Sequence, residues 1–188
     1  MRRSPSPQVS EKKPVKLGGG QEEASAYHEA GHAVVAVLLG IRLGKEGASI
    51  IPECDTEGWV HLRKGFSGNP KYDNNIKVRD GLETRVMISL AGETAQRRFW
   101  PSSVRSYEGM SDRHHAVNEL SYLTSSPEEL EPYLRWLDIR VNRMIACHWK
   151  QTTTVANALL EKKRLSAKEV LALVYPLPPI NPRYHTDK

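Results

Sequence analysis

Two histidines and a glutamate lie together in the segment HEAGH at residues 28–32. Apolar residues recur around it at intervals of three and four, which predicts an α-helix over 22–40. Because positions i and i+4 share one face of a helix, His28 and His32 can offer two imidazole nitrogens to one cation. Glu29 is rotated by about 100° from His28, a suitable position for a general base acting on water at that cation. The pattern indicates a zinc hydrolase site.

An alternative interpretation makes both histidines hydrogen-bonded core groups and Glu29 a solvated neighbour. We favour metal binding because two imidazoles and a carboxylate on one otherwise apolar turn are costly to bury without a compensating ion. Gly31 adds to this interpretation, since a glycine inside a helix costs about 1 kcal/mol relative to alanine. We therefore expect another segment to approach the helix backbone closely at Gly31.

A hydrolytic zinc site usually has three protein ligands and leaves its fourth position to water, so the motif needs a third ligand. The metzincin form of the motif is excluded, because Val35 and Leu38 stand where it requires glycine and histidine. Glu53 and Asp55 are the nearby downstream carboxylates, but they lie in a predicted turn with no helix to direct them.

Asp112 is the better candidate, because it stands at the start of a predicted helix in the segment EGMSDRHHA at residues 108–116. An aspartate at that position could instead serve only to favour the helix dipole. His115, three residues further on and on the same helix face, is a competing ligand or a hydrogen-bond partner behind the ligands.

The elements that must position these residues are predicted to be mostly helical. Ile50, Ile51 and the segment 58–62 predict a short hairpin or meander over 48–62. Helical spacing is predicted over 76–100, 111–123, 130–149 and 153–160, and a capping box at 166–169 opens a last helix that ends at Val174. The expected fold is α+β: the HExxH helix, of the zincin type, with a small sheet, followed by a helical bundle.

Composition defines the class of protein around this site. The chain has 188 residues, 39% hydrophobic and 26% charged, which fits one soluble domain over 21–174. Residues 1–20 predict a disordered basic arm, and the four prolines of 175–188 predict an extended tail. The longest apolar run, 33–39, is far below the roughly 20 residues of a membrane span. With no secretory signal behind the N-terminal arginines, we expect a cytoplasmic protein without a membrane partner.

Cysteine content and charge add two weaker constraints. Cys54 and Cys147 are far apart and lie in no CxxC context, which argues against a disulfide framework and a thiolate metal site. The net charge of +5 could favour an anionic partner, but part of the excess lies in the basic arm.

Several segments in a fixed order resemble the peptidase domain of the FtsH-type ATP-dependent zinc proteases. The matching segments are AYHEAGHA at 26–33, IIP at 50–52, GW at 58–59, LAGETA at 90–95, GMSD at 109–112 and ALLEK at 158–162. The resemblance covers about 21–174 and implies one zinc ion per chain on His28, His32 and Asp112, with Glu29 as the base.

The resemblance also implies an edge strand along which an extended substrate pairs. That strand would be formed by Gly58, Trp59, Val60, His61 and Leu62. Trp59 on this strand could line a pocket for a substrate side chain.

The chain also departs from the family. The family's AAA ATPase module and membrane helices have no counterpart here, and no Walker-type phosphate loop occurs in the sequence. We therefore expect peptide hydrolysis without ATP, with a separate ATPase partner or a homo-oligomer such as the family's hexamer left open. Gln96 stands where the family tends to have an acidic residue, which leaves open how the ligating histidines are supported.

The predicted activity is zinc-dependent endopeptidase cleavage of extended or unfolded polypeptides, with a zinc-bound water as nucleophile and Glu29 as general base. Two alternatives remain. One is a protease of narrow specificity, or a degenerate zinc-binding protein that regulates a partner. The other is a basic module whose arm binds nucleic acid, which we disfavour because the arginines of the body follow the pattern of a solvated helix face.

Overall fold

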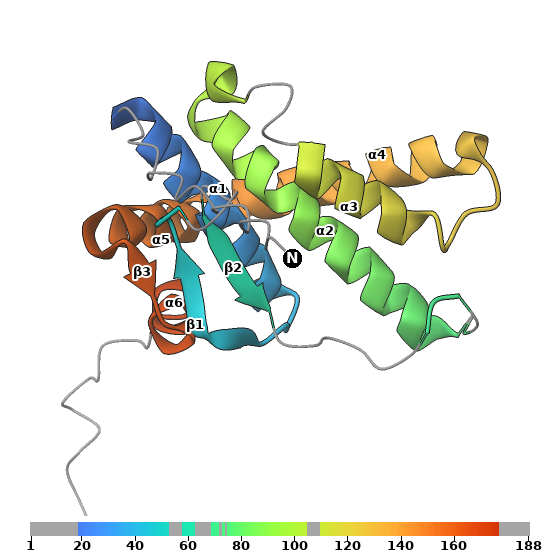
Figure 1. Cartoon of the computed structure of the whole chain (residues 1–188), viewed down its shortest axis with the longest axis horizontal. Helices are drawn as coiled ribbons and strands as arrows, with labels where there is room; N and C mark the ends of the chain where they lie inside the picture. Colours follow the sequence, from blue (N-terminus) through green and yellow to red (C-terminus); the bar gives the residue numbers. More distant parts are fainter. Residues whose placement is uncertain are drawn as a thin grey trace, which may run out of the picture.

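The computed structural model describes residues 19–52, 58–62, 69–71, 73, 75–104 and 110–176. Six α-helices and a small sheet make up this part of the chain (Figure 1). The elements are α1 (Gly19–Leu38), β1 (Leu43–Ser49), β2 (Trp59–Leu62), α2 (Ile76–Phe99), the 3-10 turn η1 (Pro101–Ser103), α3 (Met110–Leu120), α4 (Pro127–Cys147), α5 (Trp149–Lys162), β3 (Arg164–Leu165) and α6 (Ala167–Val174). The expected α+β class with mostly helical content is confirmed.

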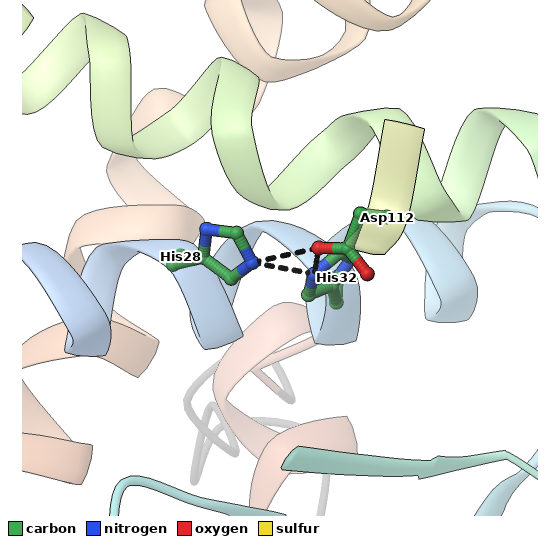
Figure 2. Close-up of side chains that lie close together, drawn as sticks. All are labelled: His28, His32 and Asp112. Carbon is green, nitrogen blue, oxygen red and sulfur yellow. Dashed lines mark hydrogen bonds and ion pairs between the residues drawn. The ribbon is translucent and has the colours of Figure 1, made fainter. Parts of the chain in front are cut away.

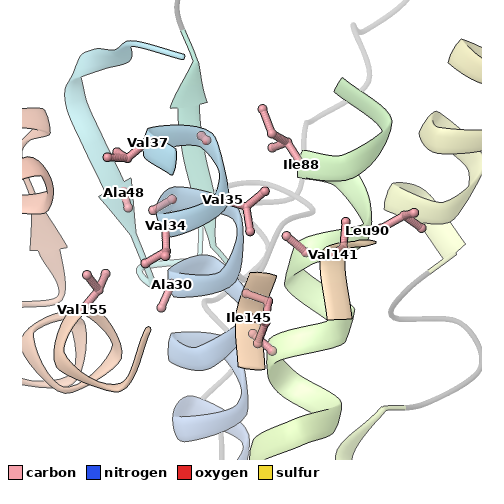
Figure 3. Close-up of a cluster of buried hydrophobic side chains, with 14 of the residues drawn as sticks. Ala30, Val34, Val35, Val37, Ala48, Ile88, Leu90, Val141, Ile145 and Val155 are labelled. Atoms are coloured by element: carbon pink, nitrogen blue, oxygen red, sulfur yellow. The ribbon is translucent and has the colours of Figure 1, made fainter. Parts of the chain in front are cut away.

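The helix α1 is the centre of the core. Figure 3 shows it between the sheet on one side and α2 on the other, with buried side chains of α4 and α5 closing the space. Val34 and Val35 of α1 are fully buried there, as are Val141 and Ile145 of α4 and Val155 of α5. Burying both faces of α1 fixes its rotation, and so fixes the direction in which its polar residues point.

Gly40 ends α1, as its position after the last periodic residue predicted. Its φ of +75° is in the left-handed region that favours glycine. The Gly40 amide donates to the Val37 carbonyl, and the Ile41 amide donates to the Ala36 carbonyl at 2.9 Å. These two bonds form a Schellman motif, which satisfies carbonyls that the end of a helix would otherwise leave unpaired.

The sheet has the strand order β2-β1-β3 with antiparallel pairing, so β1 lies between the other two strands. The hairpin predicted over 48–62 is present as the pairing of β1 with β2, but β1 begins earlier, at Leu43, and ends at Ser49, before Ile50 and Ile51. Its sequence, LGKEGAS, contains no β-branched residue and therefore has little intrinsic strand propensity. Pairing on both sides determines this strand, and Ile51 lies beyond it, exposed to solvent.

The helices α1 and α2 pack closely against each other at Gly31. A Cβ built on Gly31 would overlap the backbone carbonyl of Ala91, and it would lie 2.7 Å from the Cβ of Ala95. The close approach expected at Gly31 is therefore confirmed, and the approaching segment is α2. Small residues on both helices make this contact possible.

The last helix, α6, begins as predicted with a capping box. The Glu169 amide donates to the Ser166 side chain, and the Glu169 carboxylate accepts from the Ser166 amide at 2.8 Å. This box fixes the chain where it leaves β3, and α6 then packs against β1.

Across the described ranges, no helix is long and apolar enough to cross a membrane. Cys147 is a free, exposed thiol. Cys54, the predicted arm up to residue 18, and the predicted tail from residue 177 lie outside the described residues.

Candidate metal centre

Three side chains from two helices converge on one point (Figure 2). The Nε2 atoms of His28 and His32 lie 3.0 Å apart. The Oδ2 atom of Asp112 lies 2.9 Å from the first of these nitrogens and 3.1 Å from the second. Two imidazole nitrogens and a carboxylate oxygen form a donor set that suits zinc.

Two helices supply the three groups. His28 and His32 lie one turn apart on α1, and both rings point to the same side because positions i and i+4 share one face of a helix. Asp112 lies in the first turn of α3, which packs on α2 and α4. The fold therefore brings the carboxylate to the rings although 80 residues separate it from His32 in the sequence.

The helix α2, which supplies none of the three groups, contacts the rings through a glycine. A Cβ built on Gly92 would lie 2.5 Å from the Nε2 atom of His28 and would also overlap that of His32. Any side chain at Gly92 would occupy the place where the two nitrogens meet. The absence of a side chain at this position is thus a structural requirement of the cluster.

The outer nitrogen of each ring has a partner on α2. The Nδ1 atom of His32 donates to the carbonyl oxygen of Ile88 at 2.7 Å, because a carbonyl oxygen can only accept. The Nδ1 atom of His28 lies 2.9 Å from the Oε1 atom of Gln96. In the neutral form of His32, the proton on Nδ1 leaves the Nε2 atom with a lone pair directed at Asp112.

The charge balance of the cluster favours a cation at its centre. Burial alone would raise the pKa of Asp112, but hydrogen bonds with His28 and His32 hold it far below its usual range. Burial alone would lower the pKa of His32, but the hydrogen bond and charge of Asp112 raise it above its ordinary value. The carboxylate is therefore ionised, and positive charge is stabilised between the three groups.

Glu29 is not one of the three residues whose ligand atoms converge, and it is 6% exposed. Burial raises the pKa of Glu29 to about 7, with a smaller opposing effect of His28 and a further increase from Asp112. A Cβ on Gly58 would lie 2.7 Å from the Oε1 atom of Glu29. The carboxyl group thus lies against the chain that leads into β2.

The segment expected to bind substrate forms β2, with Gly58 directly before it. Val60 pairs with Ala48 of β1, and the described chain pairs with only this side of β2. The Trp59 and His61 rings lie 4.4 Å apart, and the guanidinium of Arg164 lies 5.6 Å from the centre of the Trp59 ring. Leu62, the last residue of the strand, is exposed.

His115, the competing ligand considered from the sequence, is exposed on α3. Within the described part of the chain, the group of converging ligand atoms contains only His28, His32 and Asp112. A role for His115 stays a prediction, and Glu53 and Asp55 lie outside the described residues.

Sequence reasoning missed the contributions of α2. Ile88 acts through its backbone carbonyl, which leaves no trace in the residue type. Gly92 could have been found, because a glycine inside a predicted helix signals close contact, as at Gly31. Gln96 was visible only as a departure from a family pattern, and its contact with His28 required the structure.

A mostly helical α+β fold in which two histidines of one helix meet a carboxylate of another defines a candidate metal centre. No protein-family model matches the chain. The ATP-dependent zinc metalloprotease FTSH 9, chloroplastic/mitochondrial, of Oryza sativa subsp. japonica is 26% identical over 81% of this chain and 22% of its own length. The ATP-dependent zinc metalloprotease YME1L1 of Homo sapiens is 25% identical over 85% of this chain and 23% of its own length.

A bacterial relative gives the same result: the ATP-dependent zinc metalloprotease FtsH of Rickettsia prowazekii is 22% identical over 85% of this chain and 30% of its own length. The resemblance predicted from the motifs is thus confirmed, and the chain is a distant relative of the FtsH-type zinc metalloproteases. It spans between 22% and 30% of the length of these three relatives.

Proposed function

We propose that this protein is a zinc-dependent endopeptidase of the HExxH type that binds one zinc ion on His28, His32 and Asp112. The observation that carries the proposal is the convergence of two imidazole nitrogens and an ionised carboxylate oxygen within 3.1 Å of one another. One of these nitrogens, on His32, has its lone pair directed inward by the Ile88 carbonyl. When both rings are neutral and present their Nε2 lone pairs, a cation between these acceptor atoms relieves their repulsion. The naming of the relatives as zinc metalloproteases supports the choice of zinc.

In the proposed peptide hydrolysis, the ion and Glu29 have different roles. A zinc ion held by these three ligands would supply a Lewis acid that polarises a carbonyl and makes water acidic near neutral pH. Glu29 is the group that accepts the proton of water and returns it to the leaving amine. Burial raises its pKa toward neutral, and efficient proton exchange needs a pKa near the working pH.

The proposed substrates are peptides, loops and unfolded chains. A strand paired on one side offers its other edge to an extended backbone, as Trp59–Leu62 does among the described elements. Its first neighbour, Gly58, lies against Glu29, so a substrate paired with this edge would pass close to the general base. Folded proteins should resist, because their backbone is not free to add a strand.

We further propose that peptide cleavage by this chain requires no ATP. The relatives are named ATP-dependent, but no Walker-type phosphate loop occurs in these 188 residues. Cleavage of folded proteins would then need an unfolding partner. Hexameric assembly and a cytoplasmic location stay predictions from the sequence.

The decisive experiment measures zinc content and casein cleavage, with and without ATP, in the wild type and three variants. We expect Glu29→Gln to keep zinc and lose cleavage, Asp112→Ala to lose both, and His115→Ala to keep zinc. Wild-type zinc content in Asp112→Ala would remove the third ligand, and undiminished cleavage by Glu29→Gln would remove the base. A wild type that binds zinc without cleaving casein or peptides would be a zinc-binding regulatory protein instead.

A further inference from the structure

Gln96 is a buried amide that joins the candidate metal centre to the chain after α2. It lies in the last turn of α2 and is only 7% exposed. Its Oε1 atom lies 2.9 Å from the Nδ1 atom of His28. Its Nε2 atom lies 3.3 Å from the side-chain oxygen and 3.4 Å from the carbonyl oxygen of Ser103 in η1. Both ends of the amide are therefore engaged.

The contacts with Ser103 determine which way the amide faces. The carbonyl oxygen of Ser103 can only accept a hydrogen bond, so the group that faces it must be the NH2 of Gln96. The hydroxyl of Ser103 already donates its proton to the Trp100 carbonyl at 2.7 Å, which leaves its oxygen as an acceptor as well. The amide oxygen of Gln96 is then the atom that faces His28.

An amide oxygen facing the ring determines where the proton of His28 resides. A neutral imidazole carries its proton on either nitrogen, and the partner of one nitrogen selects the form. The Gln96 oxygen accepts a hydrogen bond from a protonated Nδ1 and repels a lone pair there. The remaining nitrogen, Nε2, then presents its lone pair toward Asp112 and His32.

We propose that Gln96, anchored by Ser103, is a positioning residue that holds His28 in its metal-binding form, with the proton on Nδ1 and the lone pair on Nε2. This inference rests on the proposed zinc site and deepens it. Its role parallels that of the Ile88 carbonyl toward His32, so α2 directs both rings from the same side. Unlike a carboxylate, the amide does so without adding negative charge to the site.

The test compares variants that differ in their ability to accept from His28. Gln96→Met keeps the length of the side chain and removes the acceptor, whereas Gln96→Glu retains an acceptor oxygen. Thr94→Val is the matched control, because it removes a buried hydrogen bond on the same helix, from Thr94 to the Leu90 carbonyl. Zinc affinity is measured by competition with a chelator, and the proton position on His28 is read by nitrogen NMR of the zinc-loaded protein.

We expect Gln96→Met to weaken zinc binding by about 10-fold to 100-fold and to reduce protection of the Nδ1 proton of His28 from solvent exchange. Gln96→Glu, which keeps an acceptor for His28 but lacks the donor that faces Ser103, should lose less affinity than Gln96→Met, and Thr94→Val should match the wild type. Ser103→Ala, which keeps the backbone carbonyl, should cause a smaller loss of affinity than Gln96→Met. It serves as the deciding variant if Gln96→Met does not fold.

The outcomes separate this inference from the proposed function. If Gln96→Met and Ser103→Ala bind zinc like the wild type with an unchanged Nδ1 proton, the positioning role is overturned while the zinc site stands. If Thr94→Val loses as much affinity as Gln96→Met, the effect belongs to helix packing, and the role is again overturned. If the wild type itself binds no zinc, the proposed function fails together with this inference.

Discussion

Each atom in the candidate metal centre depends on its neighbours. The carboxylate oxygen of Asp112 is within 3.1 Å of both ring nitrogens, and each ring is held from behind by α2. Because Gly92 of α2 carries no side chain where the two Nε2 atoms lie, it determines how closely the rings of His28 and His32 can approach that helix. Gly92 therefore limits the geometry of the cluster although it contributes no ligand atom to it.

We predict that Gly92→Ala abolishes zinc binding in a protein that still folds. The added methyl group would lie within 2.5 Å of both Nε2 atoms, so the rings must turn away from Asp112. Alanine favours a helix over glycine by about 1 kcal/mol, which should keep α2 intact. Zinc content and circular dichroism check this prediction.

The control for this prediction is Gly81→Ala, which makes the same change on α2 about 16 Å along the helix axis from Gly92. It should bind zinc like the wild type. A Gly92→Ala variant with full zinc content would contradict the assigned positions of the rings.

At the scale of secondary-structure elements, the contact between α1 and α2 also depends on a glycine without a side chain, Gly31. We predict that Gly31→Ala lowers the free energy of unfolding, because its methyl group would overlap the Ala91 backbone, which cannot move independently of α2. Overpacking of this kind typically costs about 1–3 kcal/mol, which outweighs the gain in helix propensity of about 1 kcal/mol. Urea denaturation measures the difference, and an unchanged or raised free energy of unfolding would show that the helices can separate freely.

The start of α6 provides a pH-dependent prediction at the same scale. Hydrogen bonds from Lys162 and Ser166 lower the pKa of Glu169 from 4.5 to about 2. A carboxyl group whose pKa is lower in the folded state stabilises the fold above its unfolded pKa of 4.5, and this contribution disappears as the pH falls toward 2. The side chain is exposed, so the effect should be modest.

We therefore expect Glu169→Gln to be less stable than the wild type at pH 6, and the difference to shrink as the pH falls from about 4.5 toward 2. Urea denaturation at several pH values gives the measurement. Glu161→Gln, an exposed substitution on α5, is the control and should show no comparable trend. A difference for Glu169→Gln that stays constant down to pH 2 would exclude the capping box as its origin.

The helices could be predicted from the sequence because each carries its own signal. The apolar spacing around Val34, the glycine stop at Gly40 and the capping box at Ser166 are local features, and local features determine where a helix begins and ends. The strand β1 could not be predicted, because Gly44 and Gly47 weaken its propensity and its pairing partners lie elsewhere in the chain. Two-residue β3 is too short to carry any periodic signal.

In the candidate site, too, some residues could be predicted from the sequence and others could not. The pairing of His28 with His32 follows from helix geometry alone, so the sequence was sufficient for it. Asp112 could be chosen as a candidate by its position at a helix start, but its approach to the rings depends on how α3 packs on α2. The contacts of Gln96 and Ile88 depend on the α1–α2 crossing and carry no sequence pattern of their own.

At the scale of the whole molecule, the proposed zinc ion would join helices that are distant in the chain. His28 and Asp112 are separated by 84 residues, and α3 packs on α2 and α4. An ion held by both α1 and α3 would therefore hold the N-terminal core and the start of the helical bundle together. Because its ligands come together only in the folded chain, its binding free energy adds to the free energy of unfolding.

We predict that zinc at a free concentration 100 times its dissociation constant stabilises the wild type by about 2.7 kcal/mol. For a domain of this size, that raises the melting temperature by about 5–10 °C. Differential scanning calorimetry with and without zinc measures the shift. Asp112→Ala should show a much smaller shift and His115→Ala the full one, whereas magnesium should have little effect because it prefers oxygen ligands. An equal shift in Asp112→Ala would mean that zinc stabilises the fold from another place, since this variant lacks the only ligand that connects α3 to α1 within the described cluster.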